Sequence, residues 1–369
     1  MVQSMQIEIL LSTDVQRLEH WREQWLTLFK EQETTDLSSS YQWLANDFIH
    51  LDEGRNRRCY IAHEDGVLKG AMICESQWYK LARRLPVPVV DTGSHFVNDF
   101  MIDRLGASDT LIALIKAVQN DFPYAAWINF ERLTENCVQP IKTLSAIDPS
   151  SQLCYDNDYA AVFDVGSESV EAFTQSMSSK FKANLRNYER LMGKKIGPVV
   201  HEITVQCAGA DIDFHFNQFL DIEKSGWKGE KGTAITQMEG SNNFHYSLCK
   251  TAASHGQLRW YKLFADDHLV AMNMVIHRAS DLWVVKTAYH EKYRSFSPGA
   301  IGITKLLHSA VEDVGISKVR MISNYSWLDR WHPTREVYHG ARIFNRNLLG
   351  RICFSILQFI QKKTVYNAS

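Results

Sequence analysis

The residue types best suited to chemistry stand where a strand-like segment, ending near Tyr289, gives way to a helical pattern. There Ser297 precedes Pro298; serine is a good helix N-cap, and proline fits the first helical position. The small residues from Gly299 to Gly302 follow, so their backbone N–H groups could face an anion at the positive end of the helix. This spacing predicts a site for a phosphate-bearing cofactor; a well-started helix without a ligand is the alternative.

A second candidate is a basic helical segment. Lys182, Arg186 and Arg190 recur at four-residue spacing within a pair of helices expected over 168–195, so they share one helix face. Such a ridge suits an anionic substrate or carrier, whereas a solvated helix face is the plainer interpretation.

The elements that would position these residues form two similar series. A hairpin is expected over 58–76, turning at Asp65–Gly66, and another over 258–277, turning at Asp266–Asp267. A strand, a helix and a strand follow each hairpin, at 89–102, 107–122 and 125–130, and at 281–289, 298–314 and 318–323. The repetition predicts two copies of one α/β unit, with domains at 1–160 and 161–369.

The composition excludes several classes of protein. A formal net charge of −2 gives no general attraction to nucleic acid. The seven scattered cysteines form no CxxC pair, which favours reduced thiols, no zinc site and a cytoplasmic location. Neither a signal peptide nor a membrane span is expected. The apolar segment 345–363 has basic ends and could contact the inner membrane face peripherally, although docking on its own domain is the alternative.

Three motifs carry a family resemblance. Glu223, Ser225 and Trp227-Lys228-Gly229 precede a Gly-x-Ala-Ile run; Ala288-Tyr289-His290 precedes Ser297-Pro298-Gly299; and a basic helix begins near Lys180. Together they resemble the acetyltransferases grouped with cellulose- and polysaccharide-biosynthesis accessory proteins. Those proteins belong to the GCN5-related N-acetyltransferase (GNAT) superfamily and are similar to Fem-type aminoacyl transferases.

The motifs also depart from the family pattern. His290 stands where members have aspartate, and Gly226 is inserted before Trp227. In the segment from Ser323 to Trp331, Leu328 stands where members have lysine, and Arg330 is a candidate replacement. This loss of a cation puts the family's commonest substrate in doubt.

The resemblance implies an α/β fold of two tandem GNAT-like domains, each a mixed twisted sheet flanked by helices. It also implies that the second domain holds acetyl-CoA or another acyl-CoA, with the thioester in a splayed gap between two parallel strands. The expected contacts to the cofactor pyrophosphate lie in one loop: Arg294, Ser295, Ser297, Gly299, Ala300 and Gly302. No metal is expected, and an acyl carrier protein is an alternative donor.

Acyl transfer by direct attack needs a proton acceptor for the nucleophile and a proton for the leaving thiolate. His290 is the leading base, because an unperturbed imidazole titrates near neutral pH; an exposed strand-end histidine is the alternative. Glu223 is the second candidate base, although it could instead pair with Lys228. Tyr325 could protonate the thiolate, or be a hydrogen-bonded buried tyrosine.

The acceptor contacts are expected among aromatic and charged residues. Trp227 and Trp331 would wall a cleft, because sugars stack on aromatic faces. The other expected contacts are polar: Lys228, Lys182, Arg186 and Asp329, with His332 in the same segment.

The leading hypothesis is an acyl-CoA-dependent N- or O-acyltransferase acting on a small molecule or a glycan precursor of the cell envelope or an exopolysaccharide. A Fem-like transferase using aminoacyl-tRNA is the first alternative, because the basic ridge would suit a tRNA; otherwise no nucleic acid is expected. The second alternative is a non-catalytic scaffold of a polysaccharide-synthesis complex. The loss of the family's Tyr-Lys pair, replaced by Trp327 and Leu328, favours a scaffold, and the intact loop before Pro298 argues against it.

Overall fold

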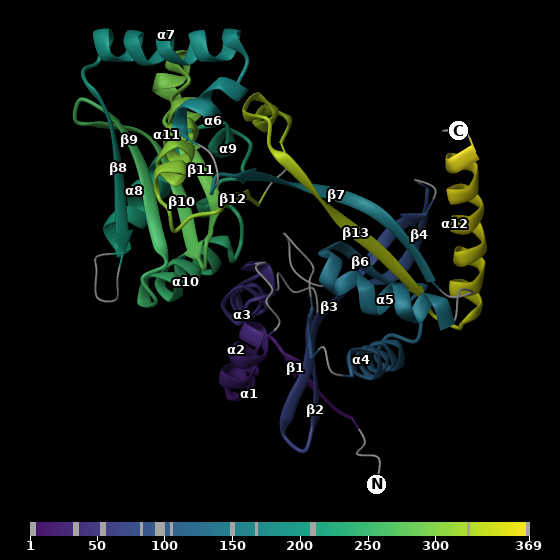
Figure 1. Ribbon diagram of the computed structural model, residues 1–369. Helices are drawn as coiled ribbons and strands as arrows, with labels where there is room; N and C mark the ends of the chain where they lie inside the picture. The colour runs from purple at the N-terminus through teal and green to yellow at the C-terminus, as the bar shows by residue number, and fades with distance from the viewer. Residues whose placement is uncertain are drawn as a thin grey trace. The chain divides into compact units, whose positions relative to one another are not determined.

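The chain forms two compact units. The computed structural model describes residues 5–31, 37–51, 57–81, 84–92, 100–103, 106–147, 152–166, 169–206, 212–322 and 325–366. Unit 1 comprises Met1–Asp158 with Val337–Ser369, and unit 2 comprises Tyr159–Glu336. The chain passes from unit 1 to unit 2 within β7 (Gln152–Asp164) and returns within β13 (Thr334–Phe344) (Figure 1).

Unit 1 is a mixed α/β structure. Besides parts of β7 and β13, its elements are β1 (Gln6–Leu11), α1 (Val15–His20), α2 (Arg22–Glu31), η1 (Leu37–Ser39), α3 (Tyr41–His50), β2 (Arg58–Glu64), β3 (Val67–Leu81), β4 (Leu85–Thr92), β5 (Met101–Ile102), α4 (Ala107–Asp121), β6 (Trp127–Leu133), α5 (Glu135–Ile147) and α12 (Leu348–Tyr366). The strand order is β1-β2-β3-β4-β6-β13, with β5 paired to β3. Only β4 and β6 are parallel neighbours within this order.

Helices cover the sheet of unit 1 because their apolar residues recur at helical spacing. Leu111, Leu114 and Val118 of α4 are buried in one core with residues of α5 and the sheet. Trp25 and Phe48 belong to a second core beneath α1, α2 and α3. A third core joins α12 to Trp127 and Phe344.

Unit 2 repeats this plan. Its elements are α6 (Val170–Ser176), α7 (Ser179–Lys195), β8 (Val199–Gln206), α8 (Ile212–Ser225), α9 (Trp227–Glu230), η2 (Ile235–Gln237), α10 (Ser241–Ser254), β9 (Leu258–Ala265), β10 (His268–Arg278), β11 (Asp281–Tyr289), η3 (Glu291–Phe296), α11 (Pro298–Glu312), β12 (Lys318–Met321) and η4 (Ser326–Trp331). The strand order β8-β9-β10-β11-β12-β7 again contains one parallel pair, β11 and β12. Helix α11 crosses between those strands, as α4 does in unit 1, and packs Ile301, Leu306 and Ala310 into the core.

The predicted repetition is therefore confirmed. Both hairpins turn where expected, and Asp65, Gly66 and Asp266 adopt the positive φ that tight hairpin turns require. One prediction was wrong: β4 begins before 89 and β5 is a separate strand on β3, while 93–99 lie outside the described residues.

The C-terminal segment 337–369 does not belong to the domain in which we expected it. We expected 337–369 in the second domain, yet it belongs to unit 1. The physical reason is that β13 pairs with β6, and Cys353 of α12 is buried against Trp127. Such long-range pairing has no signature in local sequence.

Candidate functional site

The centre of the candidate site is the end of β11. The parallel pairing of β11 with β12 runs from Asp281–Lys318 to Val284–Met321, where β12 ends. Strand β11 continues to Tyr289, and the N–H of His290 then donates to the carbonyl of Val270 at 2.9 Å. A bulge at Val285 interrupts its pairing with β10. One strand thus extends past its parallel neighbour just before α11 begins.

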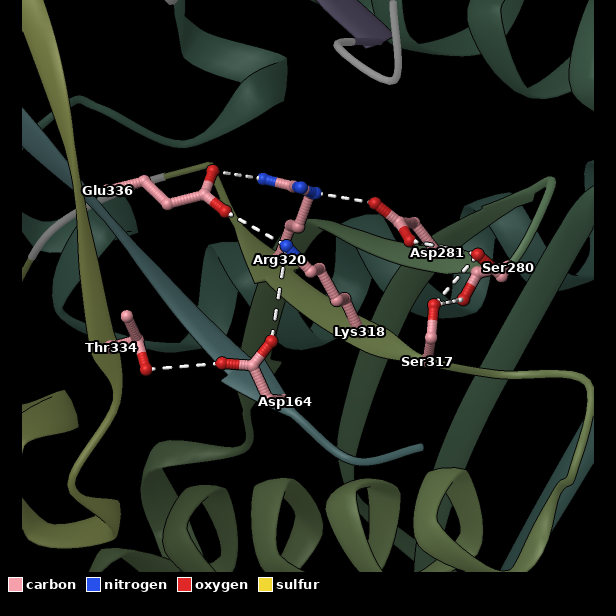
Figure 2. A network of polar contacts seen from close by, with 8 residues as sticks. All are labelled: Asp164, Ser280, Asp281, Ser317, Lys318, Arg320, Thr334 and Glu336. Carbon is pink, nitrogen blue, oxygen red and sulfur yellow. Dashed lines mark hydrogen bonds and ion pairs between the residues drawn. The ribbon is translucent and has the colours of Figure 1, made fainter. Parts of the chain in front are cut away.

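A polar network holds the opposite, paired ends of these strands together (Figure 2). Arg320 of β12 donates through Nε to Asp281 of β11 at 2.6 Å and through Nη1 to Glu336 of β13 at 2.5 Å. Lys318 lies 3.3 Å from Glu336 and 4.0 Å from Asp164 of β7. The network fixes the start of β12 to β11, β7 and β13. The pairing between β11 and β12 is lost at the other end, after Met321.

The start of α11 confirms part of the predicted geometry. Ser297 occupies the N-cap position and Pro298 the first helical position, but Ser297 has φ 49° and its side chain makes no cap hydrogen bond. The N–H groups of Ala300 and Ile301 both donate to the Ser297 carbonyl, at 3.0 and 3.2 Å. The helix start therefore offers fewer free donors than the sequence indicated.

The two glycines of the expected cofactor loop differ in position. Gly302 is buried on the sheet, where an added Cβ would lie 3.6 Å from Cβ of Ala271, so its role is close packing. Gly299 is half-buried, and an added Cβ would lie 3.1 Å from Cδ1 of Tyr289. Gly299 alone of the two thus remains a candidate for ligand contact.

Of the remaining loop residues, Ala300 is half-buried against the core and the other two are exposed. Ser295 and Arg294 face solvent, and Arg294 pairs with Glu291 at 3.2 Å while its side chain stays 77% exposed. The ammonium of Lys195 on α7 lies 5.9 Å from the ring of Phe296. The basic helix α7 therefore borders the turn that precedes α11.

The predicted residue Glu223 is a buried organising group. One carboxylate oxygen accepts from Lys228 Nζ at 2.7 Å, and the other accepts from the Ile235 N–H at 2.8 Å. Lys228 Nζ also donates to the carbonyl of Thr287 on β11 at 3.1 Å. Of the two roles open to Glu223, the geometry therefore favours pairing with Lys228, which ties α8 and α9 to β11.

The Trp227-Lys228-Gly229 motif has a steric cause. An added Cβ on Gly229 would lie 1.9 Å from the carbonyl oxygen of Lys224, so only glycine permits this turn. Trp227 is 42% exposed, and the Lys231 ammonium lies 5.3 Å from its ring. An exposed indole at this turn fits the expected acceptor wall.

Sequence reasoning missed Lys286, which is half-buried on β11 directly after the bulge at Val285. Burial lowers the pKa of Lys286 to about 8; the positive charge of Lys228 lowers it further, and the Glu223 carboxylate acts in the opposite direction. The available signal was a single lysine inside an apolar strand, because a buried amine must be paired or lose its charge.

His245 of α10 was also missed. Burial lowers the pKa of His245 to about 3, helped by the charges of Lys286 and Lys228. Its Nδ1 lies 2.7 Å from the Ser241 carbonyl, while Nε2 has no hydrogen-bond partner within the described part of the chain. His245 is therefore a neutral, buried ring near Lys286 of β11.

The two other predicted proton-transfer residues lie near the surface. His290 is half-buried at the N-cap of η3, where its Nδ1 accepts from the Lys292 N–H at 3.4 Å and its ring lies 5.5 Å from Tyr293. Tyr325 is 54% exposed and precedes η4. Both positions leave their side chains accessible, and their catalytic roles stay predictions.

Two expected acceptor contacts are engaged elsewhere. Trp331 is 1% exposed, and its indole N–H donates to Oγ1 of Thr304 at 3.0 Å. Its ring centroid lies 5.0 Å from that of Phe181, so Trp331 is a core residue and not a cleft wall. Asp329 pairs with Arg335. Ser323 and Asn324 of the same motif lie outside the described residues.

The basic ridge lies on α7 as predicted. Leu185 and Met192 are buried, whereas Arg186 and Arg190 are exposed and Lys182 is half-buried. Lys182 donates to the Gln175 carbonyl at 3.4 Å and Arg190 to Asn187 at 2.9 Å. This exposure is compatible with both interpretations of the ridge.

Metal sites and membrane-spanning helices are both absent from the described ranges. No group of three or more His, Cys, Asp or Glu residues there could hold a metal ion. Nor does any helix in those ranges have the length and hydropathy needed to cross a bilayer.

Residues 179–324 match the acetyltransferase (GNAT) domain family. No curated protein matches the chain in sequence. The matched segment runs from the start of α7 to just beyond β12, so it contains the end of β11 and the start of α11.

Solved structures resemble the chain over nearly its full length. The C-terminal domain of a lysylphosphatidylglycerol synthetase described as putative, from Agrobacterium fabrum, has a TM-score of 0.56 at 10% identity, covering 94% of this chain and 96% of that one. L-PGS from Bacillus licheniformis has a TM-score of 0.53 at 14% identity, covering 93% and 96%. FemX has a TM-score of 0.51 at 10% identity, covering 90% and 98%.

At these identities the likeness shows the fold alone. The geometry of the site and the family match concern the same part of unit 2. Residues 179–324 therefore match the acetyltransferase (GNAT) domain family, in a chain whose mixed α/β fold resembles that of FemX.

Proposed function

We propose that the protein is an acyltransferase that moves an acyl group from acyl-CoA to an amino or hydroxyl group of a sugar, cell-envelope or exopolysaccharide precursor. The observation that carries the proposal is the end of β11: it extends past β12 and leads into the Ser297-Pro298 helix start, inside the segment that matches the GNAT family. A strand that extends past its parallel neighbour beside a helix N-terminus suits a thioester with a phosphate-bearing carrier.

In this proposal the donor lies against the start of α11. Gly299 permits close approach of the carrier, while Arg294, Ser295 and the basic residues of α7 offer donors and positive charge. Phosphate groups favour such a setting because backbone dipoles and cationic side chains act on the same anion.

The chemical step is a direct attack. The acceptor nitrogen or oxygen bonds to the thioester carbon, the C–S bond breaks, the nucleophile gives up a proton, and the thiolate gains one. His290 or neutral Lys286 would accept the first proton, and Tyr325 would supply the second. Glu223 would act indirectly, by holding Lys228 on the Thr287 carbonyl. Trp227 would line the acceptor side.

Calorimetric titration of the purified chain with acetyl-CoA, and in parallel with a longer acyl-CoA, tests the donor. We expect binding of at least one, and weaker binding of S-acetylpantetheine, which lacks the phosphates. The relative affinities would define the acyl pocket. Binding of neither thioester would contradict the proposal.

The second candidate is a transferase that uses aminoacyl-tRNA. The exposed cationic face of α7 favours it, because phosphate backbones bind clustered Lys and Arg in a salt-dependent way. Reversing Lys182, Arg186 and Arg190 to glutamate should then abolish tRNA binding. The matched control reverses exposed Lys116 and Lys250. Equal tRNA binding by both variants would exclude this candidate.

A further inference from the structure

Helix α12 carries apolar residues on two sides, one in a core of unit 1 and the other largely exposed in the part of the chain that the structure describes. Leu349, Phe354 and Leu357 join Cys353 in the core that contains Trp127. A second stripe, formed by Leu348, Ile352, Ile356, Phe359 and Ile360, is exposed by between 36 and 76% of each residue. A helix that only docks on its own unit would carry polar residues on that outer side.

The end of the β3–β4 hairpin adds to the same region of unit 1. Leu81 and Val87 near this end belong to the core that holds α12, so hairpin and helix are neighbours. Beside them, Trp78 is 71% exposed and Leu85 is 57% exposed. Exposed tryptophan next to an exposed apolar helix face is uncommon on a surface that meets only water.

Charge distinguishes these two segments from the rest of the chain. Residues 76–90 and 345–366 contain seven Lys and Arg and no Asp or Glu, although the whole chain has a net charge of −2. Lys80, Arg84 and Arg351 are among the exposed cations. We call the exposed residues of these two segments the basic apolar surface.

We propose that the basic apolar surface binds the face of an anionic lipid bilayer. The apolar stripe of α12 would enter the boundary between headgroups and acyl chains, as amphipathic helices do. Trp78 would lie at headgroup level, where amphipathic rings are favoured. The cations would contact anionic headgroups, whose attraction for Lys and Arg is salt-dependent.

A second copy of the chain is the less suitable occupant. Two copies joined through this surface would bring together two acid-free, positively charged segments, and like charges in an interface oppose association. An anionic bilayer neutralises the same charges while it accepts the apolar stripe.

The test is co-sedimentation of the full chain with phosphatidylcholine vesicles, with and without about a third phosphatidylglycerol, at low and high salt. We expect binding to the anionic vesicles only, reduced at high salt, with a blue shift of tryptophan emission that Trp78→Phe diminishes. Equal binding to both vesicle types, or binding to neither, would overturn the proposal.

Two pairs of variants locate the contact. Ile352→Ser with Ile356→Ser should lower vesicle binding on the order of tenfold, whereas Val200→Ser with Val205→Ser, on exposed positions of β8, should not. Lys80→Glu with Arg84→Glu should lower it similarly, whereas Lys116→Glu with Lys250→Glu should not. All these positions are exposed, so the fold is retained.

Two results would reject the surface or its occupant. Unchanged vesicle binding by the α12 and hairpin variants would reject the surface. A dimer in light scattering that dissociates in the Ile352→Ser variant would assign it to a second copy of the chain instead.

Discussion

Each unit has one parallel strand pair at the same position in its strand order, but the residues of the two pairs differ. In unit 1 the pair β4–β6 aligns Val90 with Ile128 and Asp91 with Asn129. In unit 2 the pair β11–β12 ends on Val284 and Met321, both buried and apolar. The last aligned residues of the parallel pair are thus polar in unit 1 and apolar in unit 2.

In unit 1, side chains form hydrogen bonds across the parallel pair β4–β6 and on to β13. Register pairs Glu75 with Asp91, Asp91 with Asn129, and Asn129 with Arg342, a row across four strands. Asn129 Nδ2 donates to Asp91 at 2.8 Å and Arg342 Nε donates to Asn129 at 3.3 Å. Polar groups that satisfy each other here have less need of a ligand.

The helices that follow differ as well. Helix α4 of unit 1 begins after Gly106, without the Ser-Pro-Gly run that begins α11, and the GNAT family match covers only unit 2. The two units therefore share a topology but differ in the residue types at its parallel strand pair and at the helix that follows. The following substitutions probe that difference.

The largest effect is expected from Glu223→Ala in unit 2. Removing a buried carboxylate leaves Lys228 without its anionic partner, which costs about 3–5 kcal/mol of unfolding free energy. Denaturant unfolding with hydrogen exchange on unit 2 peptides measures it. Lys142→Ala, which breaks an exposed pair with Glu135 in unit 1, should cost under about 1 kcal/mol. Equal costs would show that Glu223 does not organise the end of β11.

Lys286→Met should stabilise unit 2 at pH 7 by about 3 kcal/mol, because the pKa of Lys286 falls from 10.5 to about 8 on folding. The unfolded state then binds more protons than the native state between pH 8 and 10.5. The stability of the wild-type protein therefore rises with pH through that window, and its difference from Lys286→Met shrinks. Thermal melts of both proteins from pH 7 to 10.5 measure this, and a constant difference would contradict it.

Gly299→Trp should lower acyl-CoA affinity by about 100-fold, because the Cβ alone would reach Tyr289 and the indole would fill the start of α11. Calorimetry gives the affinity. Asp109→Trp at the exposed first turn of α4 is the matched change in unit 1, and it should leave the affinity unchanged. Loss of affinity in both variants would place the donor outside unit 2.

Asp91→Asn should stabilise unit 1 by about 2 kcal/mol at pH 8, while an amide oxygen can still accept from Asn129. Burial raises the pKa of Asp91 to about 7; the Asn129 hydrogen bond opposes this, and Glu131 and Glu75 add to it. The native carboxyl therefore contributes stability that is present below pH 3.8 and lost as pH rises through 7. Melts at pH 5 and 8 should show the gain growing with pH; a gain that falls with pH would reverse the assigned sign.

Local sequence determined much of the scaffold. The Asp65–Gly66 turn, the length of β11 and the Ser297-Pro298 helix start follow from backbone preferences of a few neighbouring residues. The repeat follows from the order of such elements. Residue periodicity likewise separated the buried and exposed faces of α7.

Tertiary structure alone decided the rest, because contacts between distant residues leave no local pattern. Residues 337–369 belong to unit 1 because β13 pairs with β6. Trp331 is a core residue because it packs against Phe181. Glu223, a candidate base in the sequence, pairs with Lys228, which in turn donates to the Thr287 carbonyl of β11. The lowered pKa of Lys286 likewise arises from burial and from charges that only folding brings near.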